Sequence, residues 1–485
     1  MTDRVSRRDW LLASGMAAGA WTAVNLAPAA MGSGEPGPGP KTSGTNLPAV
    51  AFQRSVPVRY EVDVFVAGGG PAGTAAAVSA RKQGANVFLA EAHTCLGGMG
   101  TAGRVPTFMP FTDGVNFLAA GFGREVLTRM RKDSTTRKSE NIDTEALKRT
   151  YDAMATEAGV TFTFYTTLVA VEAEKGHVQY VVCASPSGLF AVRAKVYVDA
   201  TGNGDLAVWA GAAFEKGDEG GNLMPGTLCS VWSEIDWPTW LANRPKGPQP
   251  DGHMLEKAFA DGVFTVPDEH LTGMYRTGER LGGGNIGHAF GVDADDETSL
   301  TKALVAGRKS MKEFERYYRE YLKGFEKIQL VATGSLLGVR ETRRILGDYV
   351  LSLDDYKRRA TFGDEIGRYA YPIDNHPVRP GKDTYEQHRK EFDETLRYGK
   401  GESYGIPYRT LTPRGLDNVL VAGRCVSVDR MVHGSIRVMP GCFITGQAAG
   451  VAAAVASSTQ VAPRAIDVKE LQARLKQLGA YLPNA

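Results

Sequence analysis

The stretch that decides the fold reads EVDVFVAGGGPAG at residues 61–73. Its first seven residues are the short apolar run of a buried strand, and Gly68, Gly70 and Gly73 follow in the spacing G-x-G-x-x-G. Small residues then continue with the composition of a helix, and a second strand-like run, NVFLA, ends in the acid Glu91. This succession of strand, glycine turn, helix, strand and acid predicts a β-α-β unit.

Each of these residues has a physical task in binding a dinucleotide. Gly68 makes the tight turn, Gly70 lets the backbone approach a pyrophosphate, and Gly73 lets the helix pack on the strand. The helix N-terminus attracts phosphates, and Glu91, 21 residues after Gly70, can accept hydrogen bonds from ribose hydroxyls. A glycine turn alone is a weak signal, but these features in this order predict a dinucleotide site.

Further segments favour FAD over NAD. The run AHTCLGGMGTAG at 92–103 resembles the LGG-x-x-T segment that follows the ribose-binding acid in glutathione-reductase-type FAD proteins. VYVDATGNGD at 196–205 resembles their ATG strand end, and LDNVLVAGR at 416–424 resembles the late strand whose end meets the ribityl chain. TGQAAGV at 445–451 resembles the helix whose N-terminus faces the flavin. The resemblance covers residues 58–485 and implies FAD as the cofactor.

The motifs and the resemblance together assign a set of residues to FAD binding. They are Gly68, Gly70, Pro71, Ala72, Gly73, Glu91, Ala92, Gly97, Gly98, Met99, Thr101, Val169, Ala200, Gly202, Asp205, Gly423, Arg424, Gly446, Gln447, Ala448 and Ala449. One departure is at Arg424, where many relatives of the wider superfamily carry an acid that bonds the ribityl chain. We expect the backbone at Ala422 and Gly423 to take that task, with the Arg424 side chain acting differently or pointing elsewhere.

The predicted fold class is α/β, with a Rossmann-like FAD-binding domain that carries a β-meander insertion and a mixed α+β substrate (cap) domain. A helix-like run at 144–157 and short alternating strands between 161 and 196 follow in the order expected of that flavoprotein fold. We expect the discontinuous FAD-binding domain to comprise residues 58–205 and 401–485. The cap domain is predicted at 206–400.

The N-terminus has the form of a twin-arginine export signal. Arg7 and Arg8 precede a moderately apolar run at 11–26, which ends in an A-x-A cleavage pattern at 27–29. An arginine pair that caps an ordinary helix is the alternative, but position, order and the small-residue end favour a signal peptide over residues 1–30. The apolar run is too short and too weakly hydrophobic to predict a stable membrane span.

The export signal predicts where the protein works and what it meets. We expect a periplasmic or secreted protein that passes through the twin-arginine export machinery with its cofactor already bound. Residues 31–57 are rich in Gly, Pro and Ser, which predicts a flexible linker. The other expected partners are a small-molecule substrate and an electron acceptor that the sequence does not identify.

Composition excludes several classes of function. The chain has 485 residues, and its 56 Lys and Arg nearly balance its 54 Asp and Glu, which argues against nucleic acid as a partner. Its 57 glycines suit a nucleotide-binding enzyme with many close backbone approaches. The five cysteines form no C-x-x-C pair, so the sequence predicts neither a zinc site nor a thioredoxin-type motif, and no metal.

Four motifs in order along the chain resemble the FAD-dependent oxidoreductase family, some members of which are labelled xanthan lyase-like. They are GVRETRRILG at 338–347, YGIPYR at 404–409, AGRC at 422–425 and VHGSIRVMP at 432–440. The resemblance implies the FAD fold but supplies no reaction, because the substrates of the family are diverse. No second G-x-G-x-x-G follows a strand, so we expect the substrate rather than NAD(P)H to reduce the flavin.

Three side chains are candidates for the chemistry. Oxidation of a C–H bond by a flavin needs a base for the accompanying proton and positive charge near the reduced ring. His433 lies between the last flavin strand and the flavin-facing helix, so it is the first candidate base, with a buried histidine bonded to backbone as the alternative. His376 is the second, with a surface turn histidine as the alternative. Arg437 is assigned either to a substrate oxygen or to the pyrimidine carbonyls of the flavin.

Other features are expected to be structural. The glycine-rich run 281–288 is either a loop over the active site with His288 reaching in or a mobile surface turn, and we expect the turn. The arginines at 340–344 are expected to form helix-capping ion pairs, with the first as a lesser candidate for substrate contact. An aromatic stripe within 304–325 predicts a core helix, and 448–456 predicts a close-packed helix rather than a membrane span.

The sequence thus predicts an exported FAD-dependent dehydrogenase or oxidase. It would remove hydride from a CH–OH carbon of a sugar-like or small polar donor, with His433 or His376 as the base. Oxidation of a CH–CH or CH–NH group, a flavin-assisted elimination, and a non-enzymatic electron-transfer subunit are the alternatives.

Overall fold

The computed structural model describes residues 50–134, 140–247, 249–269, 271–388 and 396–485. Residues 50–55 are exposed and form neither helix nor strand, and residues 56–485 form one compact unit. The predicted export signal and most of the predicted linker lie outside the described residues.

The largest sheet has seven strands in the order β3-β2-β1-β6-β5-β4, with β15 paired to β6. Its strands are β1 (Val58–Ala67), β2 (Val87–Ala90), β3 (Thr161–Thr163), β4 (Thr167–Glu174), β5 (His177–Ser185), β6 (Gly188–Asp199) and β15 (Val419–Val421). The pairs β1/β2, β1/β6, β2/β3 and β6/β15 are parallel, whereas β4, β5 and β6 form an antiparallel meander. The predicted α/β fold with a Rossmann-like sheet and a meander insertion is confirmed.

The parallel strands end together at one edge of this sheet. In register, Ala67 of β1 and Val421 of β15 both pair with Asp199 of β6. The predicted glycine turn after β1, the ATG segment after β6 and the Gly-Arg segment after β15 are therefore neighbours. Ligands of open α/β sheets bind at this edge.

Seven helices accompany the sheet in the described residues. They are α2 (Pro71–Lys82), α3 (Phe122–Asp133), α4 (Thr144–Glu157), α5 (Asp205–Trp209), α11 (Arg430–Ile436), α12 (Met439–Thr459) and α13 (Val468–Gln477).

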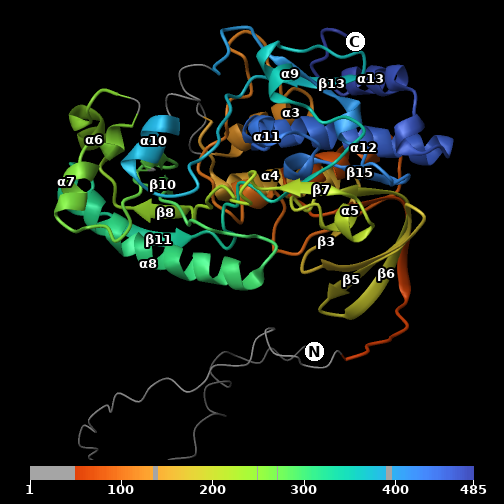
Figure 1. Cartoon of the computed structure of the whole chain (residues 1–485), viewed down its shortest axis with the longest axis horizontal. Coiled ribbons are helices and arrows are strands. Elements are labelled where there is room, and N and C mark those ends of the chain that lie inside the picture. The colour runs from red at the N-terminus through yellow and green to blue at the C-terminus, as the bar shows by residue number, and fades with distance from the viewer. Residues whose placement is uncertain (1–49, 135–139, 248, 270, 389–395) are drawn as a thin grey trace, which may run out of the picture. The chain divides into compact units, whose positions relative to one another are not determined.

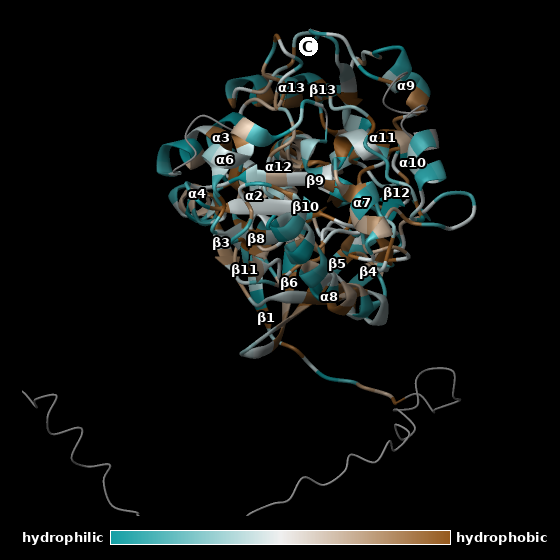
Figure 2. Ribbon diagram, turned by 90° about the vertical axis from the view of Figure 1, so that its left-hand side faces the viewer, coloured by the Kyte–Doolittle hydropathy of each residue, from teal (hydrophilic) through white to brown (hydrophobic). Residues whose placement is uncertain are grey.

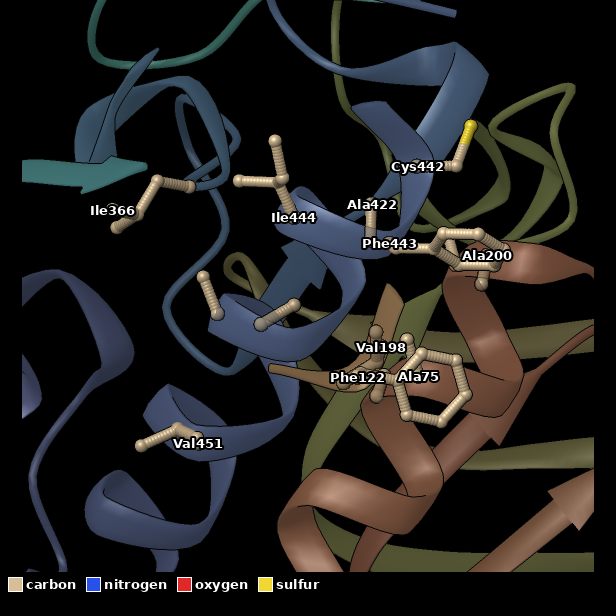
Figure 3. Packing of buried hydrophobic residues seen from close by; sticks show 14 of the residues in the cluster. Ala75, Phe122, Val198, Ala200, Ile366, Ala422, Cys442, Phe443, Ile444 and Val451 are labelled. Carbon is tan, nitrogen blue, oxygen red and sulfur yellow. The ribbon is translucent and has the colours of Figure 1, made fainter. Parts of the chain in front are cut away.

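Helix α12 lies directly against α2, and two glycines make the contact possible. A Cβ on Gly446 would clash with the carbonyl oxygen of Ala72, and one on Gly450 would clash with that of Ala76. Because both steps are four residues long and run in the same direction, the two helices are parallel. Figure 3 shows Phe443 and Val451 of α12 and Ala75 of α2 among the buried side chains of this core.

A second sheet builds the other side of the molecule (Figure 1). Its order is β11-β8-β10-β9, formed by β8 (Ser230–Ser233), β9 (Leu271–Arg276), β10 (Gly282–Ile286) and β11 (Gln329–Thr333). Helices α6 (Trp237–Asn243), α7 (Leu255–Ala260) and α8 (Glu297–Tyr321) belong to this part. We refer to residues 226–333 as the cap.

The cap has its own hydrophobic core. Trp232 of β8, Tyr317 and Tyr318 of α8 and Phe325 beyond it are fully buried together. The predicted aromatic stripe is therefore core, although α8 ends at Tyr321 and Phe325 follows in the loop.

The chain after the cap returns to the first core. β7 (Phe214–Lys216) pairs with β12 (Arg343–Ile345), and β13 (Glu365–Tyr369) pairs with β14 (Tyr404–Pro407). Between them lie α9 (Leu353–Lys357) and α10 (Lys382–His388). Buried side chains of this stretch join the core around α12, among them Tyr356, Tyr369 and Tyr404. The predicted domain boundaries at 205/206 and 400/401 stay a prediction.

The arginine cluster at 340–344 does not cap a helix, which corrects that expectation. Residues 343–345 are the short strand β12, and the fully buried Glu341 accepts from Arg344 at 2.7 Å and from Arg430 of α11 at 3.1 Å. A buried carboxylate needs such partners because its desolvation is costly. The cluster therefore ties β12 to α11.

Helix α12 has the length and apolar composition that a membrane span would need. Among the described residues it is the one helix that is long and apolar enough to cross a bilayer, and that apolar window is entirely buried in the protein. In Figure 2, α2 and α12 are pale to brown, whereas peripheral helices such as α4 and α10 carry hydrophilic residues. Residues 448–456 form the close-packed core helix that the sequence predicted.

The contact between α2 and α12 should tolerate no side chain at Gly446. We expect Gly446→Ala to lower the free energy of unfolding by about 1–3 kcal/mol, because the added methyl group overpacks a rigid backbone contact. Chemical denaturation of the purified protein measures this loss. Gly363→Ala is the matched control, since a Cβ on Gly363 meets nothing within 4 Å. Equal stability of the two variants would contradict the packing argument.

Candidate functional site

In the glycine turn between β1 and α2, two glycines are required by close packing and a third faces open space. Gly68 has φ +90° and a Cβ on it would lie 2.7 Å from Ala200 O, while a Cβ on Gly73 would clash with Gly68 O. Gly70 differs, because a Cβ there would meet nothing within 4 Å. Its φ of −63° is open to any residue. The space in front of the predicted phosphate-binding backbone is therefore open at Gly70.

The second glycine cluster lies on the first. Gly97 N donates to Gly69 O at 2.8 Å, and Thr101 Oγ1 donates to Leu96 O at 2.6 Å, which closes the loop. A Cβ on Gly98 would lie 3.2 Å from Gly70 Cα. The two predicted FAD segments thus form one surface, with Met99 half-buried and Ala92 exposed at its margin.

Glu91 holds this surface together through backbone N–H groups. Its Oε2 accepts from Gly69 N at 2.6 Å and its Oε1 accepts from His93 N at 2.8 Å. Each carboxylate oxygen retains a further lone pair for a ribose hydroxyl. Glu91 can therefore serve the predicted ribose contact while it fixes the turn.

The ends of α2 and α12 are suited to negative charge. Neither helix has a side-chain cap or an acidic residue in its first turn, so their N-terminal N–H groups and dipoles are open to an anion. Ala72 is the second residue of α2 and touches Gly446, the eighth residue of α12. Since the helices are parallel, α12 begins six residues earlier, or roughly 9 Å further out.

These features fit FAD. The open space at Gly70 and the N-terminus of α2 suit the pyrophosphate, and the start of α12 suits the flavin ring. The hydroxyl of Tyr151, fully buried beneath Gly97, has no hydrogen-bond partner within the described part of the chain. A buried hydroxyl without a partner is costly in a finished protein, which is consistent with a bound group at this position.

The ATG segment after β6 is fixed by the buried carboxylate of Asp199. It accepts from Thr201 N and Thr201 Oγ1 at 3.0 and 2.7 Å, and from Ala207 N at 2.8 Å. Burial raises the pKa of Asp199 to about 6, against the effect of these donors. The backbone at Ala200 and Gly202 is thereby held at the strand edge.

The Arg424 side chain is bonded to protein groups. Its Nε donates to Gly202 O at 2.9 Å, its Nη1 to Val339 O at 2.7 Å and its Nη2 to Asn203 Oδ1 at 2.6 Å. The guanidinium therefore clamps three protein segments together. The backbone of Gly423, with φ +83° and in contact with Ala72, is left at the sheet edge.

Some predicted FAD residues have structural contacts. Gln447 Oε1 accepts from Phe122 N at 3.0 Å, and Ala448 and Ala449 are fully buried in the core. The cofactor role of these three residues stays a prediction. Asp205 is paired with Arg343 at 2.8 Å.

Val169 lies on β4 and is 43% exposed. Its cofactor role stays a prediction.

His433 is enclosed in α11 and bonded to backbone. Its side chain is fully buried, and its Nε2 lies 2.9 Å from Arg424 O, to which it must donate. Nδ1 is buried and has no partner within the described residues. Burial, then the charge of Arg437, lowers the pKa of His433 well below its usual range. This geometry matches the alternative foreseen for His433, a neutral histidine that ties α11 to the Arg424 loop.

His376 belongs to a chain of buried polar side chains. Its Nδ1 lies 3.0 Å from His288 Nε2, and its Nε2 lies 3.3 Å from Asp374 Oδ1. His288 Nδ1 in turn lies 2.9 Å from the Tyr385 hydroxyl, which donates to Asp268 at 2.5 Å. His376 is only 10% exposed, so it is no surface turn residue.

Charges around His376 set its proton affinity. Burial and then the positive charge of Arg340 lower the pKa of His376 to about 4, although Asp374 acts in the opposite direction. Burial alone would raise the pKa of Asp374, but His376, Arg437 and Arg340 outweigh it and lower that pKa. At neutral pH the imidazole is uncharged and Asp374 is ionised.

The expectation of a mobile turn at 281–288 is wrong. Residues 282–286 are β10, a central strand of the cap sheet, and the His288 side chain beyond it is fully buried. A Cβ on Gly283 would clash with Pro106, so the glycines let this strand lie against segment 104–106. This close approach carries His288 to His376.

Arg437 connects the same cluster to the start of α12. It ends α11, one residue before Val438, the N-cap of α12. Its Nη2 donates to Asp374 O at 2.7 Å and to Asp374 Oδ2 at 3.2 Å. The cluster therefore adjoins the helix end at which the resemblance places the flavin.

Sequence reasoning missed two members of the cluster. Asp268 accepts from His288 N at 2.6 Å and from Tyr385, and it orients His288 from the far side. Neither Asp268 nor Tyr385 stands in a recognisable motif, and no local pattern marks them. Their proximity arises from the packing of the cap against α10.

Comparison with known proteins assigns a family. The profile of the family described as FAD dependent oxidoreductase matches residues 63–475. No curated protein sequence matches the chain.

Among solved structures, three similar chains are flavoenzyme-like and each is 13% identical. A geranylgeranyl bacteriochlorophyll reductase-like protein from Thermoplasma acidophilum aligns with 87% of this chain and 84% of its own, at a TM-score of 0.44. The p-nitrophenol 4-monooxygenase PnpA from Pseudomonas putida DLL-E4 covers 86% of each chain at 0.43. The myxobacterial chondrochloren halogenase CndH covers 86% and 79% at 0.39.

The glycine turn predicts opposite effects for two neighbouring substitutions. Gly70→Ala should leave the apoprotein as stable as the wild type, because the methyl group enters open space. It should weaken FAD binding by the loss of one hydrogen bond to a charged group, about 1.5–3 kcal/mol, or roughly 10- to 100-fold in Kd. Gly73→Ala should instead destabilise the apoprotein, since its methyl group clashes with Gly68 O.

Thermal unfolding of the apoprotein and titration with FAD, followed by flavin fluorescence, measure the two effects. Unchanged FAD affinity in Gly70→Ala would remove the pyrophosphate from this position.

Proposed function

The chain belongs to the FAD dependent oxidoreductase family, and from that premise we propose that it is an exported enzyme that oxidises a small organic donor at a hydroxyl-bearing carbon. FAD is its cofactor and oxidoreductase is its class. Bound FAD supplies the acceptor for the hydride that leaves the donor carbon. The protein must therefore bind the donor and take the hydroxyl proton.

The observation that carries the proposal is the buried chain Tyr385, Asp268, His288, His376 beside the start of α12. Such a chain holds one imidazole in a fixed tautomer and orientation, which is what a general base requires. It joins the cap to the flavin side of the molecule. A mere electron-transfer subunit would need no such arrangement.

The hydrogen bonds favour one direction along this chain. Tyr385 donates to Asp268, so the phenol oxygen accepts from His288 Nδ1–H. His288 Nε2 then accepts from His376 Nδ1–H at 3.0 Å, and we propose the other ring nitrogen of His376, Nε2 beside Asp374, as the proton acceptor. The Asp374 carboxylate, 3.3 Å away, stabilises the imidazolium that results.

His376 is therefore the proposed base, and His433 is a positioning residue. His433 Nε2 is committed to Arg424 O, and its ring is fully enclosed. It fixes the loop that carries Gly423, next to the glycine turn.

Replacement of the base should slow the chemistry without loss of the cofactor. We expect His376→Gln to retain FAD and to lower the rate of flavin reduction by about 10²- to 10⁴-fold. The measurement is anaerobic stopped-flow absorbance of the FAD-loaded enzyme with donors drawn from a panel of hydroxy acids, polyols and sugars. His177→Gln is the matched control, because His177 lies on β5 of the meander, is 49% exposed and pairs with Asp417.

Equal reduction rates in His376→Gln and the wild type would exclude His376 as the base. In the wild type the rate should fall only as the pH drops through about 4, since the neutral imidazole persists down to its lowered pKa. If only amines or saturated acids bleached the flavin, the reaction would be oxidation of a CH–NH or CH–CH group instead. A product whose mass equals that of the donor minus one water molecule would indicate elimination.

Export is proposed on sequence grounds, since the signal region is not among the described residues. The double substitution Arg7→Lys and Arg8→Lys should block export. Most of the mature protein should then be missing from the periplasmic fraction of a host that has the twin-arginine machinery. Immunoblots of periplasm and cytoplasm measure it. Arg54→Lys, at an exposed site, is the control. Undiminished periplasmic protein in the double variant would refute this route.

A further inference from the structure

Arg437 has a donor that the protein does not use. Its side chain is nine-tenths buried, with Nη2 bonded to the carbonyl and carboxylate oxygens of Asp374. Its Nε is buried and has no hydrogen-bond partner within the described residues. A charged N–H donor left open in a buried site calls for an acceptor from outside the chain.

A second buried cation adds positive potential at the same place. Arg340 is 8% exposed, and its Nη1 donates to Pro225 O at 2.8 Å and to Thr227 Oγ1 at 2.9 Å. Burial and then the charge of Arg437 lower the pKa of Arg340 to about 10, so the two guanidiniums repel each other. The carboxylates of Asp374 and Asp268 offset part of this charge, so the donor without an acceptor is Arg437 Nε.

Asp374 sets the spacing between this anion site and the base. Its Oδ2 contacts Arg437 and its Oδ1 contacts His376, so a single carboxylate separates the two. A donor that reaches both Arg437 Nε and His376 Nε2 must carry its negative group and its hydroxyl within a few bonds of each other.

We propose that Arg437, with Arg340 beside it, binds the carboxylate of the donor, so that the substrate is a short hydroxy acid rather than a neutral sugar. This inference rests on the proposed oxidation at a hydroxyl-bearing carbon. The donor's hydroxyl proton goes to His376 Nε2 and its carbon-bound hydrogen leaves as hydride to the bound FAD. One C–H and one O–H bond break, and the C–O single bond becomes a carbonyl.

The competing partner for Arg437 is the pyrimidine end of the flavin. The N-terminus of α12 begins one residue after Val438, is uncapped, and already supplies positive charge for that end. Arg437 instead turns to Asp374 and so to the side on which His376 and the cap lie. This orientation favours the donor.

The first test needs no variant and no turnover. The oxidised, FAD-loaded wild type is titrated with propionate and with propionamide at constant ionic strength, and binding is followed by the perturbation of the flavin absorption spectrum. The two probes share shape and differ in charge. We expect propionate to bind about tenfold or more tightly than the amide, because it gains a charge-assisted hydrogen bond.

Variants then identify the residue responsible. Arg437→Gln should abolish the preference for the acid, and Arg437→Lys, which keeps the charge and is the milder change, should retain part of it. Arg193→Gln is the matched control, since Arg193 is 58% exposed on the meander and loses the same charge. If Arg437→Gln does not fold, the same titration of Arg340→Gln replaces it.

The outcomes are distinct. Equal affinity for acid and amide in the wild type overturns the carboxylate site. Loss of FAD affinity in Arg437→Gln with the acid preference intact also overturns it and assigns the arginine to the flavin. An arginine-dependent acid preference, with no hydroxy acid able to bleach the flavin, supports the anion site while the proposed oxidation falls.

Discussion

The structure depends on the close parallel contact between α2 and α12. Gly446 and Gly450 lie against the backbone oxygens of Ala72 and Ala76, and no residue with a Cβ fits either place without displacing a helix. Because the contact is parallel, both helices present their positive ends at the same edge of the sheet. Because the N-termini of α2 and α12 are offset, the site predicted for the phosphates is separated from the site predicted for the flavin ring.

Everything that surrounds this edge is held by buried polar groups rather than by apolar packing alone. Glu91 fixes the first turn, Asp199 fixes the segment after β6, and Arg424 joins that segment to Val339. His433 bonds the Arg424 carbonyl from α11. Each of these groups makes at least one hydrogen bond to backbone, which stiffens the edge because a lost partner would leave a buried polar atom uncompensated.

The cap brings His288 to His376, and a glycine of β10 allows the close approach. β10 lies against segment 104–106 at Gly283, and the same strand ends near His288, which meets His376 from the other side of the molecule. The resulting cluster joins two histidines, two carboxylates and two arginines that come from segments far apart in the chain. Burial lowers the pKa of His376, whereas His376, Arg437 and Arg340 lower the pKa of Asp374 against the effect of burial.

The sequence by itself determined the α/β fold, because a strand, a G-x-G-x-x-G turn, a helix and an acid are fixed by neighbours in the chain. The cofactor class followed from the resemblance to FAD proteins. It did not determine the surroundings of the two candidate histidines. His433 stands in the more suggestive motif, yet its ring donates to the Arg424 carbonyl. His376 instead contacts His288, which Asp268 orients. Only tertiary packing decides such contacts, since they depend on where the cap sheet meets α10 and α11, and no local pattern encodes that distance. The glycine-rich run at 281–288 was misjudged for the same reason, because its composition suits a turn until Pro106 is known to lie beside it.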